Sequence, residues 1–243
     1  VCVGVDVDKI AGLDNFCWPD PIESEKTPDG KFKLAQLVRA NRELERVCRA
    51  YRLPCVSGKD SMKNDYGKGP DKISIPPTLL FSLFGDHPDV RNSATSDLKQ
   101  PGDKLYLVGE SLEELGASEL AFMMAENGQA AGIGGNVPLL TDPERLFSSY
   151  RALSKAINSG VIKTAHDCSE GGVGVALAEM CIGGRIGAKI DIDGTGNSST
   201  WARLWGESLG RIIISVSPQN NAKFLELMAG HTTTLLGLSL IHI

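Results

Sequence analysis

The sequence predicts a mixed fold of the α+β or α/β class, because helix-type and strand-type patterns alternate along the chain. Residues 33–51 carry apolar side chains at helical spacing, with Lys and Arg on the other faces. Residues 78–85, TLLFSLFG, form a short apolar run of the kind that makes a buried strand. From residue 104 onward, strands and helices are predicted to follow one another in turn.

The first part of the chain is predicted to be a small α+β domain. Residues 10–14 indicate a short strand, and the helix at 33–51 follows after a loop rich in proline and acidic residues. Residues 55–56 begin a short extended segment. The next stretch, SGKDSMKNDYGKG at 57–69, has no apolar period and is predicted to be a polar loop.

A polar segment separates this domain from the rest. Residues 86–102 combine Pro, Asp, Ser and Asn with little that can be buried. We therefore expect a partial, barrel-forming domain at 1–88, a linker at 89–98 and a C-terminal α/β domain at 99–243.

The second domain is predicted to contain strands and helices in alternation. The predicted strands span 104–109, 188–192 and 211–216, with a short final strand, and the helices span 119–126, 143–159, 171–182 and 220–228. Two loops interrupt this pattern, a glycine-rich one at 130–138 and a longer one at 193–210.

The amino-acid composition and charge argue against several classes of protein. The net charge of −5 disfavours nucleic acid as a partner, and no apolar run approaches the length of a membrane-spanning helix. The six cysteines form no C-x-x-C pair and four histidines are scattered, which indicates a reducing cytoplasm and no zinc site. Because the chain lacks an initiator Met and ends without a polar tail, we expect it to be a piece of a longer protein.

The first candidate site is the stretch AHDCSEGG before the helix at 171–182. Polar side chains and two glycines at a helix N-terminus favour an anion, because free N–H groups face the ligand. Asp167 could hold the Mg²⁺ that accompanies a polyphosphate. The alternative is an ordinary capped core helix, with His166 a core histidine.

The second candidate site is the segment Ser57 to Ser61. Gly58 permits close backbone approach, Lys59 offers a point charge for phosphate, Asp60 a metal ligand and Ser61 a hydroxyl. The spacing of a Walker A loop is missing, and the alternative is a solvated turn. Asp14, at the end of a predicted strand, is a third candidate, with a turn-initiating role as its alternative.

Six motifs together resemble a known family. They are LDNFCWPDP, PCVSGKDSMKND, PPTLLFSLFG, GASELA, AHDCSEGGVGVALAEM and GESLGRIIISV, and they occur in this order over nearly the whole chain. This series is similar to the second of two tandem synthetase halves in the phosphoribosylformylglycinamidine synthases. These enzymes belong to the aminoimidazole ribonucleotide synthetase-like family of ATP-binding proteins.

The resemblance implies an ATP-dependent C–N ligase of purine biosynthesis. In such enzymes ATP phosphorylates the amide oxygen of formylglycinamide ribonucleotide, and ammonia from glutamine then displaces the phosphate to give the amidine. ATP and Mg²⁺ are the implied cofactors. The implied partners are the first synthetase half and a glutaminase domain or subunit, and the isolated chain is expected to be inactive.

The resemblance also implies roles for the first group of candidates. Residues matching Asp14 and Gly58 touch ATP, and the residue matching Ser61 touches substrate. Position 59 is a magnesium-binding Asn in the short form of these enzymes, whereas the long single-chain form has Lys, as here. This difference favours a catalytic contact of Lys59 with phosphate. Asp60 remains a metal candidate.

In the second domain the resemblance implies an auxiliary, structural nucleotide. The residues matching Asp167 and Ser169 hold this nucleotide and its magnesium, together with acidic residues from a segment that would precede Val1. The family's catalytic histidine lies in the first half.

Three other assignments stay open. One is another ATP-dependent member of the same family, such as selenophosphate synthetase, thiamine-monophosphate kinase or a hydrogenase maturation factor, although DNFCWPDP and GKDSMKND are unlike those. Another is a non-catalytic, structural nucleotide-binding half. The last is an unrelated α/β binding module, which would make all six matches accidental.

Overall fold

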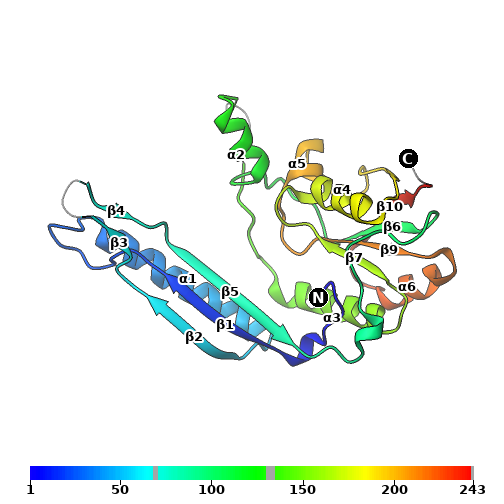
Figure 1. The fold of residues 1–243 in the computed structure, drawn as a ribbon, viewed down its shortest axis with the longest axis horizontal. Helices are drawn as coiled ribbons and strands as arrows, with labels where there is room; N and C mark the ends of the chain where they lie inside the picture. Colours follow the sequence, from blue (N-terminus) through cyan, green and yellow to red (C-terminus); the bar gives the residue numbers. More distant parts are fainter. Residues whose placement is uncertain (68–70, 130–134, 242–243) are drawn as a thin grey trace. The chain divides into compact units, whose positions relative to one another are not determined.

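The structure is a computed structural model, and it describes residues 1–67, 71–129 and 135–241 (Figure 1). Helices and strands are both present throughout, which confirms the mixed class. Within the described residues, no helix has both the length and the apolar character needed to cross a membrane.

The chain divides into two compact units. Unit 2 comprises Asp8–Asp86, and unit 1 comprises Val1–Val7 together with His87–Ile243. The first seven residues belong to unit 1 because its helical side chains bind their backbone. Ser154 Oγ donates a hydrogen bond of 2.7 Å to the carbonyl of Val5.

The segment expected to be a linker, residues 89–98, packs into unit 1. Ala94 and Leu98 are buried in its core, and the N–H of Leu98 donates to the carbonyl of Met180 at 3.1 Å. Only these two apolar side chains anchor an otherwise polar segment, which is why its composition resembles that of a linker.

Unit 2 is built on a sheet of three strands in the order β2-β1-β5. The central strand β1 (Ile10–Cys17) pairs in parallel with β2 (Cys55–Ser61) and antiparallel with β5 (Thr78–Gly85). Residues 57–61 are therefore part of a strand rather than of the predicted loop. The polar pattern concealed this strand because β2 lies at the edge of the sheet and its side chains are mostly exposed.

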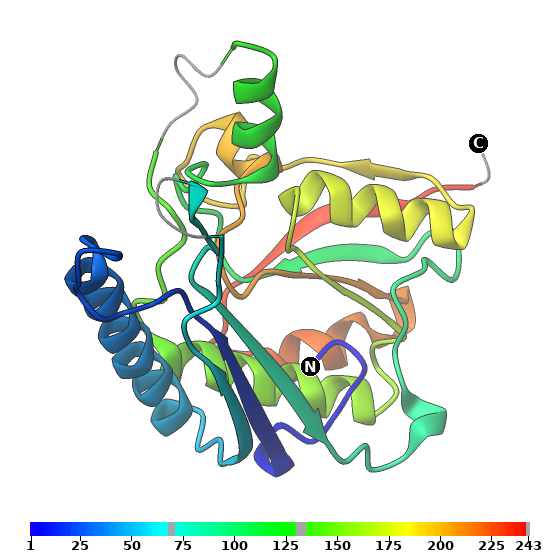
Figure 2. The same cartoon turned by 60° about the vertical axis from the view of Figure 1, so that its left-hand side comes forward.

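The helix of unit 2, α1 (Gly30–Ala50), confirms the helix predicted from the apolar spacing. Figure 2 shows α1 running alongside the strands of unit 2. A two-stranded ribbon of β3 (Asp65–Tyr66) and β4 (Ile73–Ser74) completes the described part of the unit. Buried Lys33 of α1 reaches this ribbon, with Nζ 3.0 Å from Ser74 Oγ.

The sheet of unit 2 has two unlike faces, because successive side chains of a strand point to opposite sides. Phe16 and Trp18 are buried on the face toward α1, where Trp18 Nε1 donates to the carbonyl of Lys33. On the opposite face, Leu80 is 59% and Phe84 is 53% exposed. The predicted buried strand, β5, is thus apolar but exposed on this side. The reason is that α1 covers only the other face of the sheet.

Unit 1 is built on a five-stranded sheet in the order β7-β9-β6-β10-β8, with every neighbouring pair antiparallel. Its strands are β6 (Lys104–Val108), β7 (Thr164–Asp167), β8 (Ala188–Ile190), β9 (Ile212–Val216) and β10 (Thr233–Ser239). The pattern predicted each of them except β7, whose four residues end in the polar stretch around Asp167.

Unit 1 has five helices in the described residues. They are α2 (Glu119–Glu126), α3 (Pro143–Asn158), α4 (Gly172–Gly184), α5 (Thr200–Trp205) and α6 (Asn221–Leu227). All but α5 were predicted; α5 is a short helix inside the predicted loop at 193–210. Short 3-10 turns span Val7–Lys9, Val90–Asn92 and Pro218–Asn220. The predicted loop at 130–138 lies mostly outside the described residues.

Unit 1 buries an apolar core on both faces of its sheet. Tyr106 and Ile214 pack with α3 and α6 on one face, whereas Leu105 and Ile213 pack with α4 on the other. Figure 1 shows these helices on opposite sides of the strands. Alternation along β6 and β9 therefore supplies both halves of the core.

Candidate functional site

Two of the predicted ATP-binding residues meet in unit 2. Asp14 of β1 and Gly58 of β2 are direct register partners on neighbouring parallel strands. Both lie on the face of the sheet toward α1, because they alternate with Leu13, Asn15 and Lys59 on the other side. The carboxylate of Asp14 lies over Gly58, in the space that a side chain would otherwise occupy.

Lys59 and Ser61 lie on the opposite, more exposed face of the same sheet. They are register partners of Asn15 and Cys17, and Lys59 Nζ donates a hydrogen bond to Ser61 Oγ. Because residues 57–61 form a strand, the predicted set is divided between two faces. Lys59 and Ser61 lie on one face, and Asp14 and Gly58 lie on the other.

Asp60 falls on the same face as Asp14 and is the register partner of Phe16. In the residues that the structure describes, no three His, Cys, Asp or Glu side chains gather as a metal site. A cation held at Asp60 would therefore take its remaining ligands from other oxygen atoms, such as those of water or of a bound phosphate.

The polar stretch of unit 1 begins on β7 and runs into α4. His166 is held from two sides, with Nδ1 donating to the carbonyl of Asp167 at 2.9 Å and Nε2 lying 2.9 Å from Glu179 Oε2. The Asp167 side chain is 63% exposed, and Ser169 is exposed as well. Their oxygens are free to meet a ligand, which fits the chemistry of a magnesium-bound phosphate.

The N-terminus of α4 is arranged differently from the expectation. The N–H of Gly171 donates to Glu207 Oε1 at 2.9 Å, and that of Gly172 donates to the carbonyl of Ser169 at 3.0 Å. A carboxylate of the chain itself thus caps this positive end. An anion bound here would contact the hydroxyl of Ser169 and a cation held by Asp167, rather than these two N–H groups.

Packing also explains the two glycines at this turn. Gly171 and Gly172 have φ of 76° and 63°, the left-handed region that favours glycine. A Cβ on Gly172 would lie 2.4 Å from the carbonyl oxygen of Gly206. The Gly-Gly pair is required by the backbone whether or not a phosphate binds.

Glu207 and Arg211 were not among the predicted site residues. Glu207 Oε1 also accepts from the N–H of Glu119, so one carboxylate joins the starts of α2 and α4. Arg211 is almost fully buried and donates to Ser111 Oγ at 2.9 Å and to the carbonyls of Ser208 and Gly206. Both residues belong to the motif GESLGR, and this motif was the feature of the sequence that could have pointed to them.

Cys168, although adjacent to Asp167, belongs to the core. It is 7% exposed, and burial raises the pKa of its thiol to about 12. The thiol is therefore protonated at neutral pH and is unsuited to binding a metal, since metals bind the thiolate.

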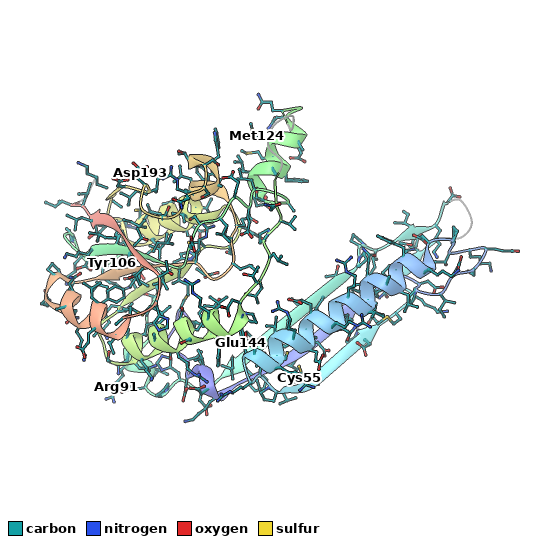
Figure 3. All side chains as sticks on the ribbon, turned by 180° about the vertical axis from the view of Figure 1, so that it is seen from behind. Cys55, Arg91, Tyr106, Met124, Glu144 and Asp193 are labelled. Atoms are coloured by element: carbon teal, nitrogen blue, oxygen red, sulfur yellow. The ribbon has the colours of Figure 1, made fainter. Side chains whose placement is uncertain are left out.

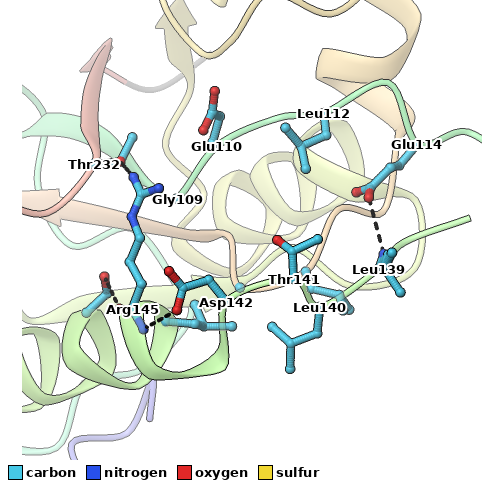
Figure 4. A pocket seen from close by; sticks show the side chains of 14 residues that line it. Gly109, Glu110, Leu112, Glu114, Leu139, Leu140, Thr141, Asp142, Arg145 and Thr232 are labelled. Atoms are coloured by element: carbon cyan, nitrogen blue, oxygen red, sulfur yellow. Dashed lines mark hydrogen bonds between the residues drawn. The ribbon is translucent and has the colours of Figure 1, made fainter. Parts of the chain in front are cut away.

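A separate pocket of about 140 Å³ lies in unit 1 (Figure 4). Arg145 lines it and donates to Thr232 Oγ1 at 2.9 Å, while buried Glu114 accepts from the N–H of Leu139 at 3.2 Å. Figure 4 shows the side chains of Glu110 and Asp142 there as well. None of the predicted site residues lines this pocket.

The predicted residues therefore form two groups, each within its own unit. Unit 2 carries five of them, Asp14, Gly58, Lys59, Asp60 and Ser61, and unit 1 carries Asp167 and Ser169. Each group offers charged or hydroxyl side chains, which can bind a phosphate or the cation that accompanies it.

Comparison with known families defines the class of protein. Residues 100–236 match the family described as AIR synthase related protein, C-terminal domain. The match covers more than half of the chain, and the chain belongs to this family.

Curated relatives match over most of this chain. The chain is 33% identical over 220 residues to phosphoribosylformylglycinamidine synthase subunit PurL of Deinococcus radiodurans, covering 88% of this chain and 27% of that protein. It is 34% identical over 230 residues to the subunit of the same name from Limosilactobacillus reuteri, covering 95% and 28%. The chain thus spans somewhat over a quarter of the length of these relatives.

Solved structures share the fold at low identity. PurL of Thermotoga maritima in complex with FGAR has a TM-score of 0.64 at 16% identity, covering 99% of this chain and 36% of that one. Hydrogenase maturation protein HypE in complex with ATP has a TM-score of 0.64 at 13% identity, covering 98% and 66%. These likenesses establish the fold.

Proposed function

We propose that this chain is part of an ATP-dependent phosphoribosylformylglycinamidine synthase and forms its second synthetase half. The complete enzyme would convert formylglycinamide ribonucleotide, glutamine and ATP to formylglycinamidine ribonucleotide, glutamate, ADP and phosphate. Its further parts would be a first synthetase half and a glutaminase domain or subunit. We place it in the cytoplasm, where reducing conditions suit the six unpaired thiols.

Family membership and the curated relatives support this assignment. Several subunits with the name PurL match 88–95% of this chain at 30–34% identity. The likeness to HypE supports the alternative, another ATP-dependent member of the family, only at the level of the fold. The relatives therefore favour the synthase.

The observation that carries a catalytic role is the contact between Lys59 and Ser61 on the exposed face of the unit 2 sheet. A lysine and a hydroxyl on a rigid strand offer a positive charge and a neutral hydrogen-bond partner at fixed spacing. We assign Lys59 to a phosphate oxygen and Ser61 to the ribonucleotide. Lys59 would stabilise negative charge that develops during phosphoryl transfer.

The same face is the one that we expect the first synthetase half to cover. Leu80 and Phe84 expose apolar surface on the same face as Lys59 and Ser61, and both outer strands leave an unpaired edge in the described residues. A second set of strands would complete a barrel and exclude water from the reaction. Exclusion of water strengthens each charge interaction inside the site.

A structural nucleotide in unit 1 is the second part of the proposal. Asp167 would bind Mg²⁺ and Ser169 a phosphate oxygen, since both side chains are exposed at the start of α4. Mg²⁺ bound there would neutralise polyphosphate charge. The carboxylate of Glu207, already at the helix end, leaves the side chains as the main contacts.

The test is steady-state kinetics of the complete enzyme with ammonium in place of glutamine, so that the synthetase step is observed alone. Removing one positive charge from a dry site costs about 2–4 kcal/mol of barrier, so Lys59→Ala is expected to lower kcat by about 10²–10³. Ser61→Ala is expected mainly to raise KM for the ribonucleotide. Lys31→Ala, at an exposed position of α1, is the matched control.

If both site variants stay within about twofold of the parent enzyme, a difference under ~0.5 kcal/mol, this strand is not part of the active site. Glutaminase activity is measured in parallel. A loss confined to the synthetase step supports the proposal, whereas a loss of both activities indicates a folding defect.

A further inference from the structure

Two cysteines of unit 2 lie in direct contact. The Sγ atoms of Cys48, near the end of α1, and Cys55, the first residue of β2, are 3.8 Å apart. Figure 3 shows Cys55 at the end of unit 2 where α1 finishes. Neither the predicted site nor the proposed reaction uses this pair.

The turn between the two cysteines has a defined backbone, which fixes their relative positions. Arg52 adopts a left-handed backbone with φ of 51°, its N–H donates to the carbonyl of Arg49, and the N–H of Leu53 donates to the carbonyl of Cys48 at 2.8 Å. These two bonds form a Schellman motif, which closes the helix and reverses the chain. The carbonyl of Pro54 then accepts from the N–H of Gly12, which fixes the start of β2 on the sheet.

The pair is accessible from one side. Cys55 is exposed, and both cysteines line a surface hollow together with Arg49 and Arg52. Cys48 is less exposed, and burial, followed by its hydrogen bond with Cys55, raises the pKa of its thiol to about 11. A small oxidant in solvent would therefore meet Cys55 first.

We propose that Cys48 and Cys55 form a redox-active dithiol that a peroxide closes to a reversible intramolecular disulfide. The thiolate of Cys55 attacks one peroxide oxygen and breaks the O–O bond, so Cys55 becomes a sulfenic acid and the hydroxide that leaves takes up a proton to become water. The sulfur of Cys48 then attacks the sulfenic sulfur, forms the S–S bond and releases the hydroxyl as water. In total, two thiols and hydrogen peroxide give one disulfide and two molecules of water.

The geometry suits this closure. A disulfide has an S–S length of about 2.0 Å, so the sulfur atoms must approach by roughly 3.8 − 2.0 = 1.8 Å, which side-chain rotation can supply. The new bond would tie α1 to the first residue of the strand that carries Gly58, Lys59 and Ser61. A dithiol in a reducing compartment would stay open and close only under oxidative challenge.

The experiment uses the whole chain at low concentration, treated with hydrogen peroxide and then with a maleimide that labels free thiols. Trypsin cleaves after Arg49 and Arg52, which places the two cysteines on separate peptides. We expect two fewer labelled thiols and one disulfide-linked peptide pair, both reversed by dithiothreitol. Cys48→Ser and Cys55→Ser should each abolish the link, and Cys17→Ser, from the same unit, should retain it.

Three outcomes would overturn the proposal. One is oxidation of Cys55 to sulfinic or sulfonic acid while Cys48 remains open to labelling. Another is a disulfide found only between two chains, seen as a dimer on a non-reducing gel. The third is a link that survives in the Cys48→Ser variant, because Cys55 would then pair with a different cysteine.

Discussion

The carboxylate of Asp14 fills the volume that a side chain on Gly58, its partner on the adjacent parallel strand, would need. A Cβ built on Gly58 would lie 1.9 Å from Asp14 Oδ1. The glycine is thus required by the carboxylate beside it, because any side chain would displace Asp14. The two residues that the resemblance assigned to ATP form one unit of structure, although 43 residues separate them in the sequence (58 − 14 − 1).

This relationship predicts a double-mutant cycle. Gly58→Ala is expected to force the Asp14 side chain away from its rotamer and to destabilise unit 2 by roughly 0.5–1.5 kcal/mol. In an Asp14→Ala background, the same change should cost little, because the clashing carboxylate is gone. Hydrogen exchange of unit 2 amides measures both. Equal costs in the two backgrounds would show that the residues do not interact.

The exposed apolar face of unit 2 predicts self-association of the isolated chain. Leu80→Glu is expected to shift the chain toward monomer, since it places a charge within that apolar surface. Sedimentation velocity over a range of concentrations gives the distribution. Leu225→Glu, at an exposed position of α6 in unit 1, is the matched control and should change little. A parent chain that is monomeric at every concentration would contradict the prediction.

Substitution of Asp167 is expected to change the thermal stability of the complete enzyme more than its turnover. If its nucleotide is structural, Asp167→Ala should lower the melting temperature while kcat at saturating substrate changes less than threefold. The reason is that a ligand bound only by the folded state stabilises it by mass action. Thermal unfolding with and without added ADP and Mg²⁺ is the measurement. Lost activity at an unchanged melting temperature would instead give Asp167 a catalytic role.

Asp65 predicts a pH dependence of stability in unit 2. Burial alone would raise the pKa of Asp65, but hydrogen bonds from Ser74 and Lys72 outweigh it and hold the pKa below the ordinary value of 3.8. When folding lowers the pKa of a carboxyl, its charge stabilises the folded state. This contribution is complete at pH values above the ordinary pKa, and it is lost as the pH falls toward the folded-state pKa. The Lys72 Nζ to Asp65 Oδ2 distance is 3.1 Å.

Asp65→Asn should therefore destabilise unit 2 by about 1.5–3 kcal/mol at pH 7, and the difference from the parent should shrink below pH 3.8. Hydrogen exchange of the unit 2 amides in urea across this range measures it. Asp86→Asn, at an exposed position of the same unit, is the control. A difference that is constant with pH would show that the charge of Asp65 does not contribute.

The sequence by itself determined the elements whose side-chain pattern repeats locally. The spacing of apolar residues predicted α1 and α3, and the run TLLFSLFG predicted β5, because these patterns record which side of an element is apolar. Six ordered motifs also indicated the family before any contact was known.

Only the tertiary structure decided how the candidate residues group. Residues 57–61 are a strand because β1 supplies their backbone partners, and a polar sequence carries no record of a neighbour that is distant in the chain. That pairing sends Lys59 and Ser61 to one face and Asp14 and Gly58 to the other. In the same way, Glu207 reaches the N–H of Gly171 across 36 positions, so the charge at the start of α4 is set by a contact rather than by local sequence.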